Sequence, residues 1–394
     1  MQYDQHTYRL TDTGNYGTVA LIVGVVGLIG SAVGYITDPA QFFHSYLTAF
    51  FFWLSLGLGG LFFVMLHHLV GAKWSVVLRR LSENIMMTIP VMAMLFIPLL
   101  FGIKELFHWS HPELVATDHL LQSKEPYLNV TFFILRAVVY FVIWMLLAFL
   151  LNRYSLKQDQ AHDNKLVRTL RVISAPGMIL FALSITFAGF DWLMSLDAHW
   201  YSTIFGVYVF SGNLLGMLAF LTFSILSLQS KNVLTGVITP EHHHDLGKLL
   251  FAFTVFWAYM AFSQYFLIWY GNIPEETVWF LERWESSWKI ISLLLVFGHF
   301  AVPFFVLFPA GAKRHRGVLM VISIWLLIMH WVDLHWLVMP SLHPHGIHFS
   351  WMDPVTMIGL GGVFVWLFRR RTAAKPLVPV NDPGLGDSIR FINH

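Results

Sequence analysis

Residues 43–70 read FHSYLTAFFFWLSLGLGGLFFVMLHHLV, a long, mostly apolar run that holds three histidines and no aspartate, glutamate, lysine or arginine. A helix of about 20 mostly apolar residues is enough to cross the hydrocarbon core of a bilayer. We therefore predict a transmembrane helix over 43–70, and this span decides the class of protein. The sequence on both sides of it follows the same pattern.

The composition of the whole chain is that of a membrane protein. Of its 394 residues, 57% are apolar and 12% are charged, and the mean hydropathy is +0.64, which lies outside the soluble range. Nine further candidate spans are 17–36, 84–103, 129–151, 175–194, 203–228, 246–270, 288–309, 317–339 and 354–368. We predict an all-α membrane protein with ten transmembrane helices. The polar residues 1–15 hold one basic residue, and no small-residue cleavage site follows, so we expect the first span to be retained as a helix.

An internal repeat organises the ten spans. A shift of 155 positions aligns the second span with the sixth without a gap and gives six identities in 23 positions. His44, Tyr46, Thr48, Phe50, Gly57 and Leu66 fall on His199, Tyr201, Thr203, Phe205, Gly212 and Leu221. The repeat predicts two parallel four-helix bundles, spans two to five and spans six to nine, flanked by spans one and ten.

Four segments follow from this division. They are a cytoplasmic N-terminus with the first flanking helix (1–42), a first four-helix bundle (43–194), a second four-helix bundle (195–339), and an outer loop with the tenth helix and a basic cytoplasmic tail (340–394).

Lysine and arginine are distributed unevenly between the two sides of the predicted membrane. Of the 24, 19 lie in the N-terminus, the C-terminal tail and the loops on that side, four lie in the opposite loops, and Arg136 lies inside a span. The positive-inside rule places both termini in the cytoplasm. The outer loops carry eleven acidic residues against those four bases, which fits either a basic partner or a solvated acidic face.

Cysteine is absent, which excludes thiolate-held iron–sulfur clusters and covalently bound c-type haem. A b-type haem would need two facing histidines in mid-membrane, and only His299 and His330 lie that deep. The outer-loop histidines near Asp353 match no spacing typical of metal ligands. We expect no haem, iron–sulfur cluster or metal in the chain, so electrons would have to arrive on a diffusible quinone or a neighbouring subunit.

Ionisable residues inside the spans indicate a functional site, because a charge in lipid is costly. Five of them cluster in the outer half of the membrane, namely Arg136, Asp191, His299, His330 and Asp333. We interpret them as candidates for proton transfer. Arg136 and Asp191 lie on antiparallel neighbouring spans and are expected to pair, while His330 and Asp333 share one helix face. The alternative for Arg136 and Asp191 is a structural ion pair that only holds two helices together.

Asp191 and Trp192 also fit a quinone site, in which a carboxylate accepts protons from the quinol beside an aromatic slot open to lipid. His44 and Tyr46, at the outer end of the second span, are further candidates for contact with the quinone. An ordinary aromatic belt at the membrane interface would give the same pattern around Trp192.

Titratable residues also flank the first bundle at its inner end. His67 and His68 close the second span and Glu83 precedes the third, so they are candidates for an inner proton path. Solvation at the interface is the alternative. Prolines inside the third and eighth spans predict kinks there, with or without a cavity beside them.

Two stretches carry a family resemblance. Residues 187–200, FAGFDWLMSLDAHW, and residues 262–277, FSQYFLIWYGNIPEET, resemble the NrfD-like, quinone-binding-type membrane subunits of bacterial alternative complex III, which are similar to the polysulfide reductase NrfD family. The resemblance covers essentially the whole chain and implies two four-helix bundles with two flanking helices.

The resemblance implies a respiratory complex in the bacterial inner membrane that oxidises menaquinol. Expected partners are an iron–sulfur, molybdopterin-like subunit, multi-haem c-type cytochrome subunits, a paralogous NrfD-like subunit, a terminal oxidase and lipids, with no nucleic acid. Within such a complex this chain is expected to contribute a proton path, a menaquinone pocket, or both. The alternatives are a purely structural subunit of that complex and a stand-alone secondary transporter, although no pair of matching broken spans marks a transport site.

Overall fold

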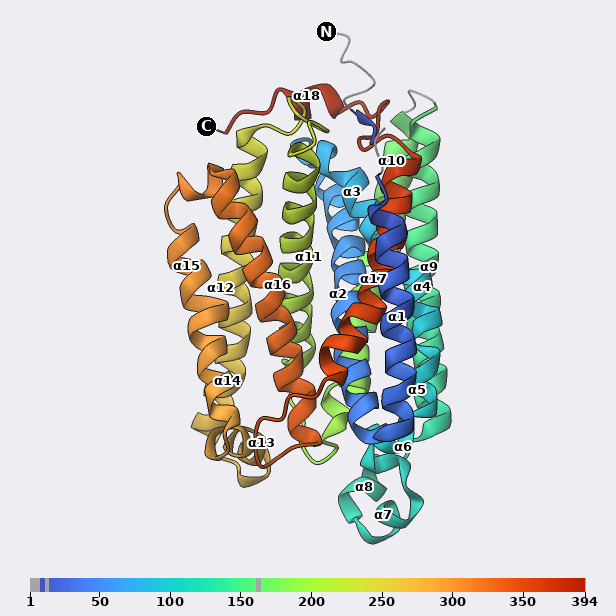
Figure 1. Ribbon diagram of the computed structural model, residues 1–394, viewed down its shortest axis with the longest axis vertical. Helices are drawn as coiled ribbons and strands as arrows, with labels where there is room; N and C mark the ends of the chain where they lie inside the picture. Colours follow the sequence, from blue (N-terminus) through green and yellow to red (C-terminus); the bar gives the residue numbers. More distant parts are fainter. Residues whose placement is uncertain (1–7, 11–13, 161–163, 394) are drawn as a thin grey trace.

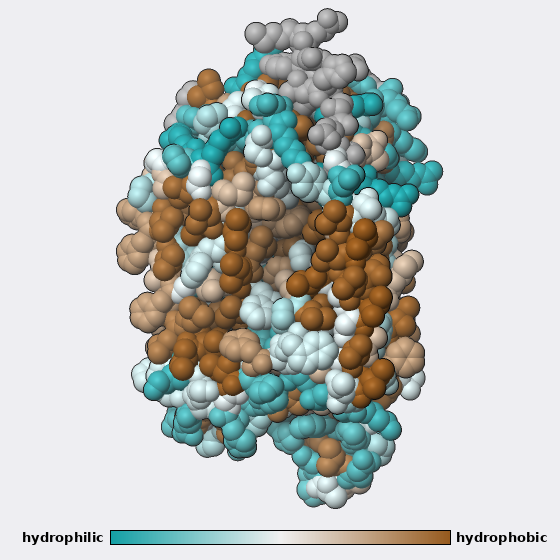
Figure 2. Space-filling view, viewed as in Figure 1, coloured by the Kyte–Doolittle hydropathy of each residue, from teal (hydrophilic) through white to brown (hydrophobic). Residues whose placement is uncertain are grey.

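The computed structural model describes residues 8–10, 14–160 and 164–393, and across these ranges the secondary structure is helical, with no strand. Ten helices are long and apolar enough to cross a membrane. They run side by side along the long axis, and α1 begins at the same end of the molecule where α17 ends (Figure 1). Figure 2 shows an apolar band between two hydrophilic ends. The predicted class, an all-α membrane protein with ten spans, is confirmed.

The spans are formed by α1 (Tyr16–Thr37), α2 (Pro39–Val70), α3 to α5 (Val76–Met86, Ile89–Leu95, Ile97–Phe101), α9 (Val130–Gln158), α10 (Asn164–Trp192), α11 (Phe205–Gln229), α12 (Pro240–Gly271), α14 with η4 and α15 (Trp288–Leu294, Leu295–Ala301, Val302–Leu307), α16 (Arg316–Val338) and α17 (Met352–Ala374). Shorter helices are α6 (Ile103–Leu106), η2 (His108–Ser110), α7 (Pro112–Thr117), α8 (His119–Lys124), η3 (Met194–Leu196), α13 (Pro274–Glu285), η5 (Ala312–Arg314), η6 (Met339–Ser341) and α18 (Leu385–Ile389).

Several helices run further than their predicted spans. The fifth span, α10, begins at Asn164 instead of 175, and the seventh span, α12, begins at Pro240 instead of 246. The hydropathy pattern detects only the part of a helix that faces lipid or apolar core, whereas polar turns can continue the same helix beyond the bilayer.

Prolines break the third and eighth spans, as predicted. Pro90 lies in the first turn of α4, Pro98 in that of α5 and Pro303 in that of α15. Between α14 and α15 the backbone forms the π-helical segment η4, which contains His299. Such segments are rare and are frequent at functional sites.

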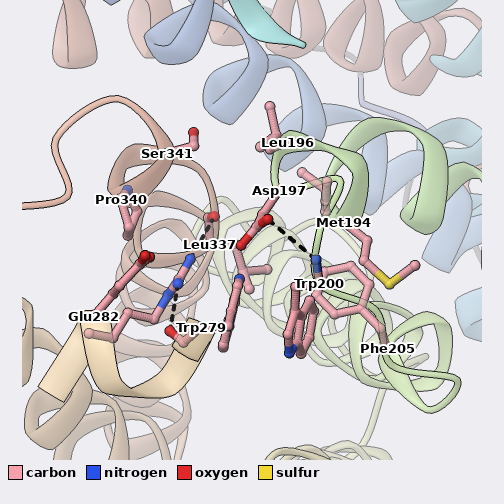
Figure 3. Close-up of a pocket in the computed structure, with 12 residues that line it drawn as sticks. Met194, Leu196, Asp197, Trp200, Phe205, Trp279, Glu282, Leu337, Pro340 and Ser341 are labelled. Atoms are coloured by element: carbon pink, nitrogen blue, oxygen red, sulfur yellow. Dashed lines mark hydrogen bonds between the residues drawn. The ribbon is translucent and has the colours of Figure 1, made fainter. Parts of the chain in front are cut away.

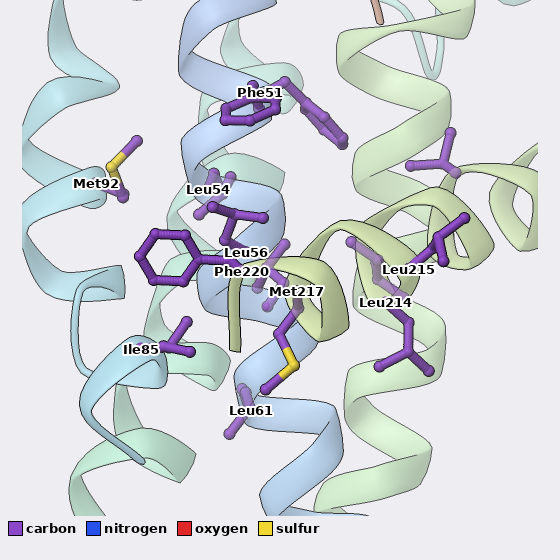
Figure 4. Close-up of a cluster of buried hydrophobic side chains, with 14 of the residues drawn as sticks. Phe51, Leu54, Leu56, Leu61, Ile85, Met92, Leu214, Leu215, Met217 and Phe220 are labelled. Carbon is purple, nitrogen blue, oxygen red and sulfur yellow. The ribbon is translucent and has the colours of Figure 1, made fainter. Parts of the chain in front are cut away.

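The centre of the molecule is the pair α2 and α11, the first helices of the two predicted repeats. Their most apolar windows are 83% and 89% buried, against 22–50% for the other spans. Figure 4 shows Leu54, Leu56 and Leu61 of α2 beside Met217 and Phe220 of α11. A helix that is apolar on all sides belongs in such a position. Because α2 also contacts α3, α10, α16 and α17, the division into two bundles stays a prediction.

The two flanking helices pack against each other along much of their length, with α1 outermost (Figure 1). Glycines allow the close approach, since a Cβ atom built on Gly27 would lie 2.6 Å from the Cα of Gly359. One built on Gly24 would lie 2.9 Å from the backbone nitrogen of Val363. Small residues at a helix contact are the usual means of close packing in lipid.

The variant Gly27→Val tests this contact. The added side chain would force the two backbones apart, so we expect a loss of about 1–3 kcal/mol, the usual cost of overpacking. Thermal unfolding of the purified protein in detergent measures it. Gly17→Ala on the same helix is the control, because within the described ranges its Cβ would meet only the Cβ of Arg369, at 4.0 Å. Equal melting temperatures for Gly27→Val and the parent would contradict the proposed role of the glycines.

The C-terminal segment after α17, predicted only as a basic tail, folds back across the helix ends at the pole where α1 begins and α17 ends. Asp382 pairs with the buried Arg79 of α3, and the Oγ of Ser388 donates to the carbonyl of Trp74 over 2.6 Å. Further along, the Nδ2 of Asn393 donates to a carboxylate oxygen of Asp245 on α12 over 2.9 Å. The segment therefore ties the ends of α3 and α12 together.

Candidate functional site

The predicted ion pair between α9 and α10 is present. The guanidinium of Arg136 donates from Nε and Nη2 to both carboxylate oxygens of Asp191, over 2.8 and 2.9 Å. The Oη of Tyr140 donates to the same carboxylate over 2.7 Å, and the Nη1 of Arg136 donates to the carbonyl of Tyr127. Asp191 is completely buried. A bidentate pair with both charges satisfied is the geometry of a fixed structural contact.

The predicted quinone contacts are enclosed by protein. Trp192 is 1% exposed and packs among the rings of Phe50, Phe96, Tyr140 and Phe141. The expectation of a slot open to lipid beside Asp191 and Trp192 is therefore wrong for this conformation, because aromatic residues of α2, α4 to α5 and α9 cover the ring. Proximity to lipid could not be inferred from an aromatic-rich sequence alone.

His44 and Tyr46 already have partners in the same interior. The Nδ1 of His44 lies 2.8 Å from the carbonyl of Ala40. The Oη of Tyr46 donates to the carbonyl of Leu95 over 2.9 Å, in the span that prolines break. Tyr46 thus satisfies a backbone acceptor beside a kink, and a role in binding quinone stays a prediction.

A second buried carboxylate, Asp333 of α16, has a different environment. It accepts hydrogen bonds from the Oη of Tyr208 on α11 and, over 3.0 Å, from the Nε1 of Trp257 on α12. It is 3% exposed and forms no salt bridge with the described residues. Both donors are uncharged, so this carboxylate is not neutralised as Asp191 is by Arg136.

Two histidines accompany Asp333. The Nε2 of His330 lies 2.8 Å from the Oγ of Ser55 on α2, and its Nδ1 has no hydrogen-bond partner among the described residues. His299 stacks on Trp257 with ring centroids 4.0 Å apart, and neither of its ring nitrogens has a partner within the described ranges. Trp257 therefore contacts both Asp333 and His299, and His330 lies one turn from Asp333 on α16.

Glycines of α11 make room for this cluster. A Cβ built on Gly216 would lie 2.8 Å from the Cδ2 of His330. A Cβ on Gly212 would lie 3.4 Å from the His330 ring and 3.7 Å from a carboxylate oxygen of Asp333. Both side chains thus face α11, which confirms the prediction that they share one face of their helix.

A small pocket lies about one helical turn outward from Tyr208 and Asp333 (Figure 3). Its volume is about 30 Å³, and Phe205, Leu337, Trp279, Asp197, Glu282 and Arg283 are among its lining residues. Phe205 precedes Tyr208 by one turn on α11, and Leu337 follows Asp333 by one turn on α16. The pocket therefore lies between the buried carboxylate and the pole where α16 ends.

Charged groups of the outer loops surround this pocket. The Cζ of Arg283 on α13 lies 3.5 Å from the ring centroid of Trp279. The Nη1 of Arg283 donates to the carbonyl of Trp279 over 2.9 Å. Burial lowers the pKa of Arg283 to about 9, so at neutral pH it remains a cation. Burial, with the neighbouring carboxylate of Asp197, raises the pKa of Glu282 above its ordinary value. A carboxyl group with a raised pKa exchanges protons closer to neutral pH.

The predicted inner residues are also buried, each with its own set of contacts. Glu83 is completely buried, accepts from the Oγ of Ser155 over 2.6 Å and lies 3.3 Å from the Nε of Arg80. The Nδ1 of His68 lies 3.2 Å from the Nη1 of Arg79, and the Nδ1 of His67 lies 2.7 Å from the carbonyl of Phe63. Interfacial solvation, the alternative for these residues, is wrong because the C-terminal segment and α9 cover them.

Some members of these sites carried little signal in the sequence. Tyr140 follows Arg136 by four residues, so it lies on the same face one turn further along, and that spacing could have predicted it. Tyr208, Trp257 and Ser55 lie in apolar or aromatic spans where nothing distinguishes them from ordinary packing residues.

No model of a known protein family matches the sequence, and the search among curated proteins gives no match. The resemblance to NrfD-like membrane subunits accordingly stays a prediction.

Proposed function

We propose that this chain is a proton-transferring membrane subunit of a quinol-oxidising respiratory complex. Its second helical unit, the predicted bundle of spans six to nine, carries the proton, and its first helical unit is the predicted bundle of spans two to five. The supporting observation is the environment of Asp333, a buried carboxylate whose hydrogen-bond donors in the described part of the chain are the uncharged Tyr208 and Trp257. Two histidines with unpartnered ring nitrogens lie beside it. Ionisable groups inside a membrane span that are not neutralised by pairing are typical of proton relays.

Depth along the helices supports a relay across the outer half of the membrane. At 1.5 Å per residue, Asp333 lies about 8 Å and His330 about 12 Å from the outer end of α16 at Val338. His299 lies about 16 Å from the start of α14 at Trp288. The three groups thus stand at successive depths, which suits stepwise transfer.

Further polar groups extend this series inward. Ser323 precedes His330 by two helical turns on α16, and Thr254 precedes Trp257 by one turn on α12. The hydroxyl oxygens of both are buried without a hydrogen-bond partner among the described residues. Unsatisfied buried polar atoms are the groups to which ordered water binds in proteins. Protons would move between these hydroxyls and the histidines through such water.

The outer pocket offers the exit from Asp333. A volume of about 30 Å³ holds one or two water molecules, whereas a site for an organic ligand of quinone size has roughly 300–1,000 Å³. Water in this pocket would connect Asp333 to the carboxylates of Asp197 and Glu282. The pocket therefore favours protons over quinone as the species handled at this end.

The wider assignment rests on the resemblance described above. It supports a place in the bacterial inner membrane with both termini in the cytoplasm, beside iron–sulfur and multi-haem cytochrome subunits and a paralogous membrane subunit. Menaquinol would be oxidised in that assembly, with electrons passing to a soluble carrier or a terminal oxidase. The fully paired Arg136 and Asp191 favour a structural role for the first helical unit.

Extraction from native membranes with a mild detergent tests this assignment. The band that contains the chain is identified by native electrophoresis, haem staining and mass spectrometry. We expect it to migrate with c-type haem and iron–sulfur subunits. Migration of the chain alone would reject the respiratory complex and make a secondary transporter the function to pursue.

A further inference from the structure

A groove lies between the start of α1 and the end of α17, at one pole of the molecule. Its volume is about 320 Å³, and Gly14, Gly17, Thr18, Trp366, Arg369 and Arg370 are among its lining residues. The small residues form the hollow, since a Cβ on Gly17 would meet, among the described residues, only the Cβ of Arg369, at 4.0 Å. The volume is that of a small-molecule site.

The groove is electropositive. Arg369 and Arg370 line it, and none of its described lining residues is acidic. A third cation stands close by, because the Nζ of Lys231 lies 4.0 Å from the ring centroid of Tyr16, and the Cζ of Arg369 lies 5.7 Å from the same ring. The Cζ of Arg370 lies 5.5 Å from the ring centroid of Trp366. Clustered arginine and lysine side chains of this kind recognise phosphate groups.

The position of the groove matches the boundary between hydrocarbon and headgroups. It lies at the first turn of α1, which begins at Tyr16, and in the last turns of α17, which ends at Ala374. Tyrosine and tryptophan, present here as Tyr16 and Trp366, are the side chains enriched at that level of a bilayer. A ligand in the groove would therefore meet lipid headgroups before bulk water.

An apolar track continues from the groove along α1. Val19, Ile22, Val26 and Ile29 are 54%, 58%, 64% and 62% exposed and recur at three- and four-residue intervals. Side chains at this spacing form one outward stripe on a helix. The stripe runs from the groove toward the opposite pole, along the direction that acyl chains take from a headgroup.

We infer that the groove binds the phosphate-bearing headgroup of an anionic phospholipid, with the acyl chains lying along the outward stripe of α1. The cations of Arg369, Arg370 and Lys231 select the negative charge, and the hollow over Gly17 admits the headgroup. This inference is independent of the proposed proton transfer, which concerns α11, α12 and α16 and not the two helices that form the groove.

Native mass spectrometry of the purified full-length chain, titrated with phosphatidylglycerol or phosphatidylcholine, tests the inference. We expect one tightly held phosphatidylglycerol that phosphatidylcholine does not replace. A basic residue near anionic headgroups contributes about fivefold in affinity. Arg369→Gln and Arg370→Gln should each weaken phosphatidylglycerol binding by about that factor, whereas Arg390→Gln, at the same pole but outside the lining, should leave it unchanged.

Gly17→Leu separates a built site from general attraction to a basic surface. The variant keeps every charge and fills the hollow, and leucine also favours the helix more than glycine does. We expect it to lose the bound lipid. Phosphatidylglycerol binding equal to the parent in Gly17→Leu, equal retention of phosphatidylcholine, or displacement of the lipid by millimolar inorganic phosphate alone would each overturn the inference. The arginine variants keep the test decisive if Gly17→Leu is poorly folded.

Discussion

Asp333→Asn is expected to lower proton transfer by a factor of about 100 or more, the usual contribution of a positioned acid–base group. Asparagine has nearly the same shape and can still accept from the Nε1 of Trp257 and lie beside Tyr208, so the helices should keep their packing. It cannot take up or release a proton. The relay would then lack its outermost buried carrier.

The purified complex, reconstituted in vesicles that contain a pH-sensitive dye, provides the measurement. Proton movement is followed during quinol oxidation and, separately, under an imposed potassium diffusion potential. Asp333→Glu should restore much of the transfer because it returns a titratable group. Asp191→Asn is the matched control, an equally buried carboxylate in the other unit that is held by Arg136. Undiminished transfer in a folded Asp333→Asn complex would reject the relay.

Arg136→Met is expected to destabilise the protein by about 3–5 kcal/mol, because it leaves the carboxylate of Asp191 buried without its counter-charge. The uncharged hydroxyl of Tyr140 would still donate to that carboxylate, but it supplies no counter-charge. A loss of this size is a large part of the stability of a typical protein. We expect lower yield and a clearly reduced melting temperature in detergent.

The double variant Arg136→Met, Asp191→Leu distinguishes an unpaired charge from lost packing. Removing both charges usually restores most of the stability that a single replacement costs. Arg136→Lys keeps the charge without the two-pronged contact and should fall between the parent and Arg136→Met. If Arg136→Met melted like the parent and yet lost proton transfer, Arg136 would have a role in proton transfer and not in stability.

The fold was largely predictable because lipid imposes a simple rule on sequence. Every backbone group in the membrane must be satisfied within the segment, so each long apolar run had to be a helix. The pairing of α1 with α17 was not predictable. Their glycines have no pattern that identifies the partner, and the two runs lie at opposite ends of the sequence.

Contacts between charged residues in the candidate site could be predicted from the sequence. Contacts that depend on how the helices pack could not. Arg136 and Asp191 were expected to meet because a lone charge in lipid requires a partner, and they do. The difference between Asp191 and Asp333 was not visible, since it depends on Tyr208 and Trp257, which other helices bring to the carboxylate. Likewise, the enclosure of Trp192 depends on rings contributed by three different helices.

The contact between α1 and α17 constrains the order in which the protein assembles during synthesis. About 330 residues separate Gly27 from Gly359, and at roughly 5–20 residues per second the ribosome needs about 15–70 s to make them. During that time the glycine face of α1 lacks its partner helix α17, so the insertion machinery or lipid must cover that face. Of these two helices, α1 is made first, and it reaches its native contact only after α17 has been made.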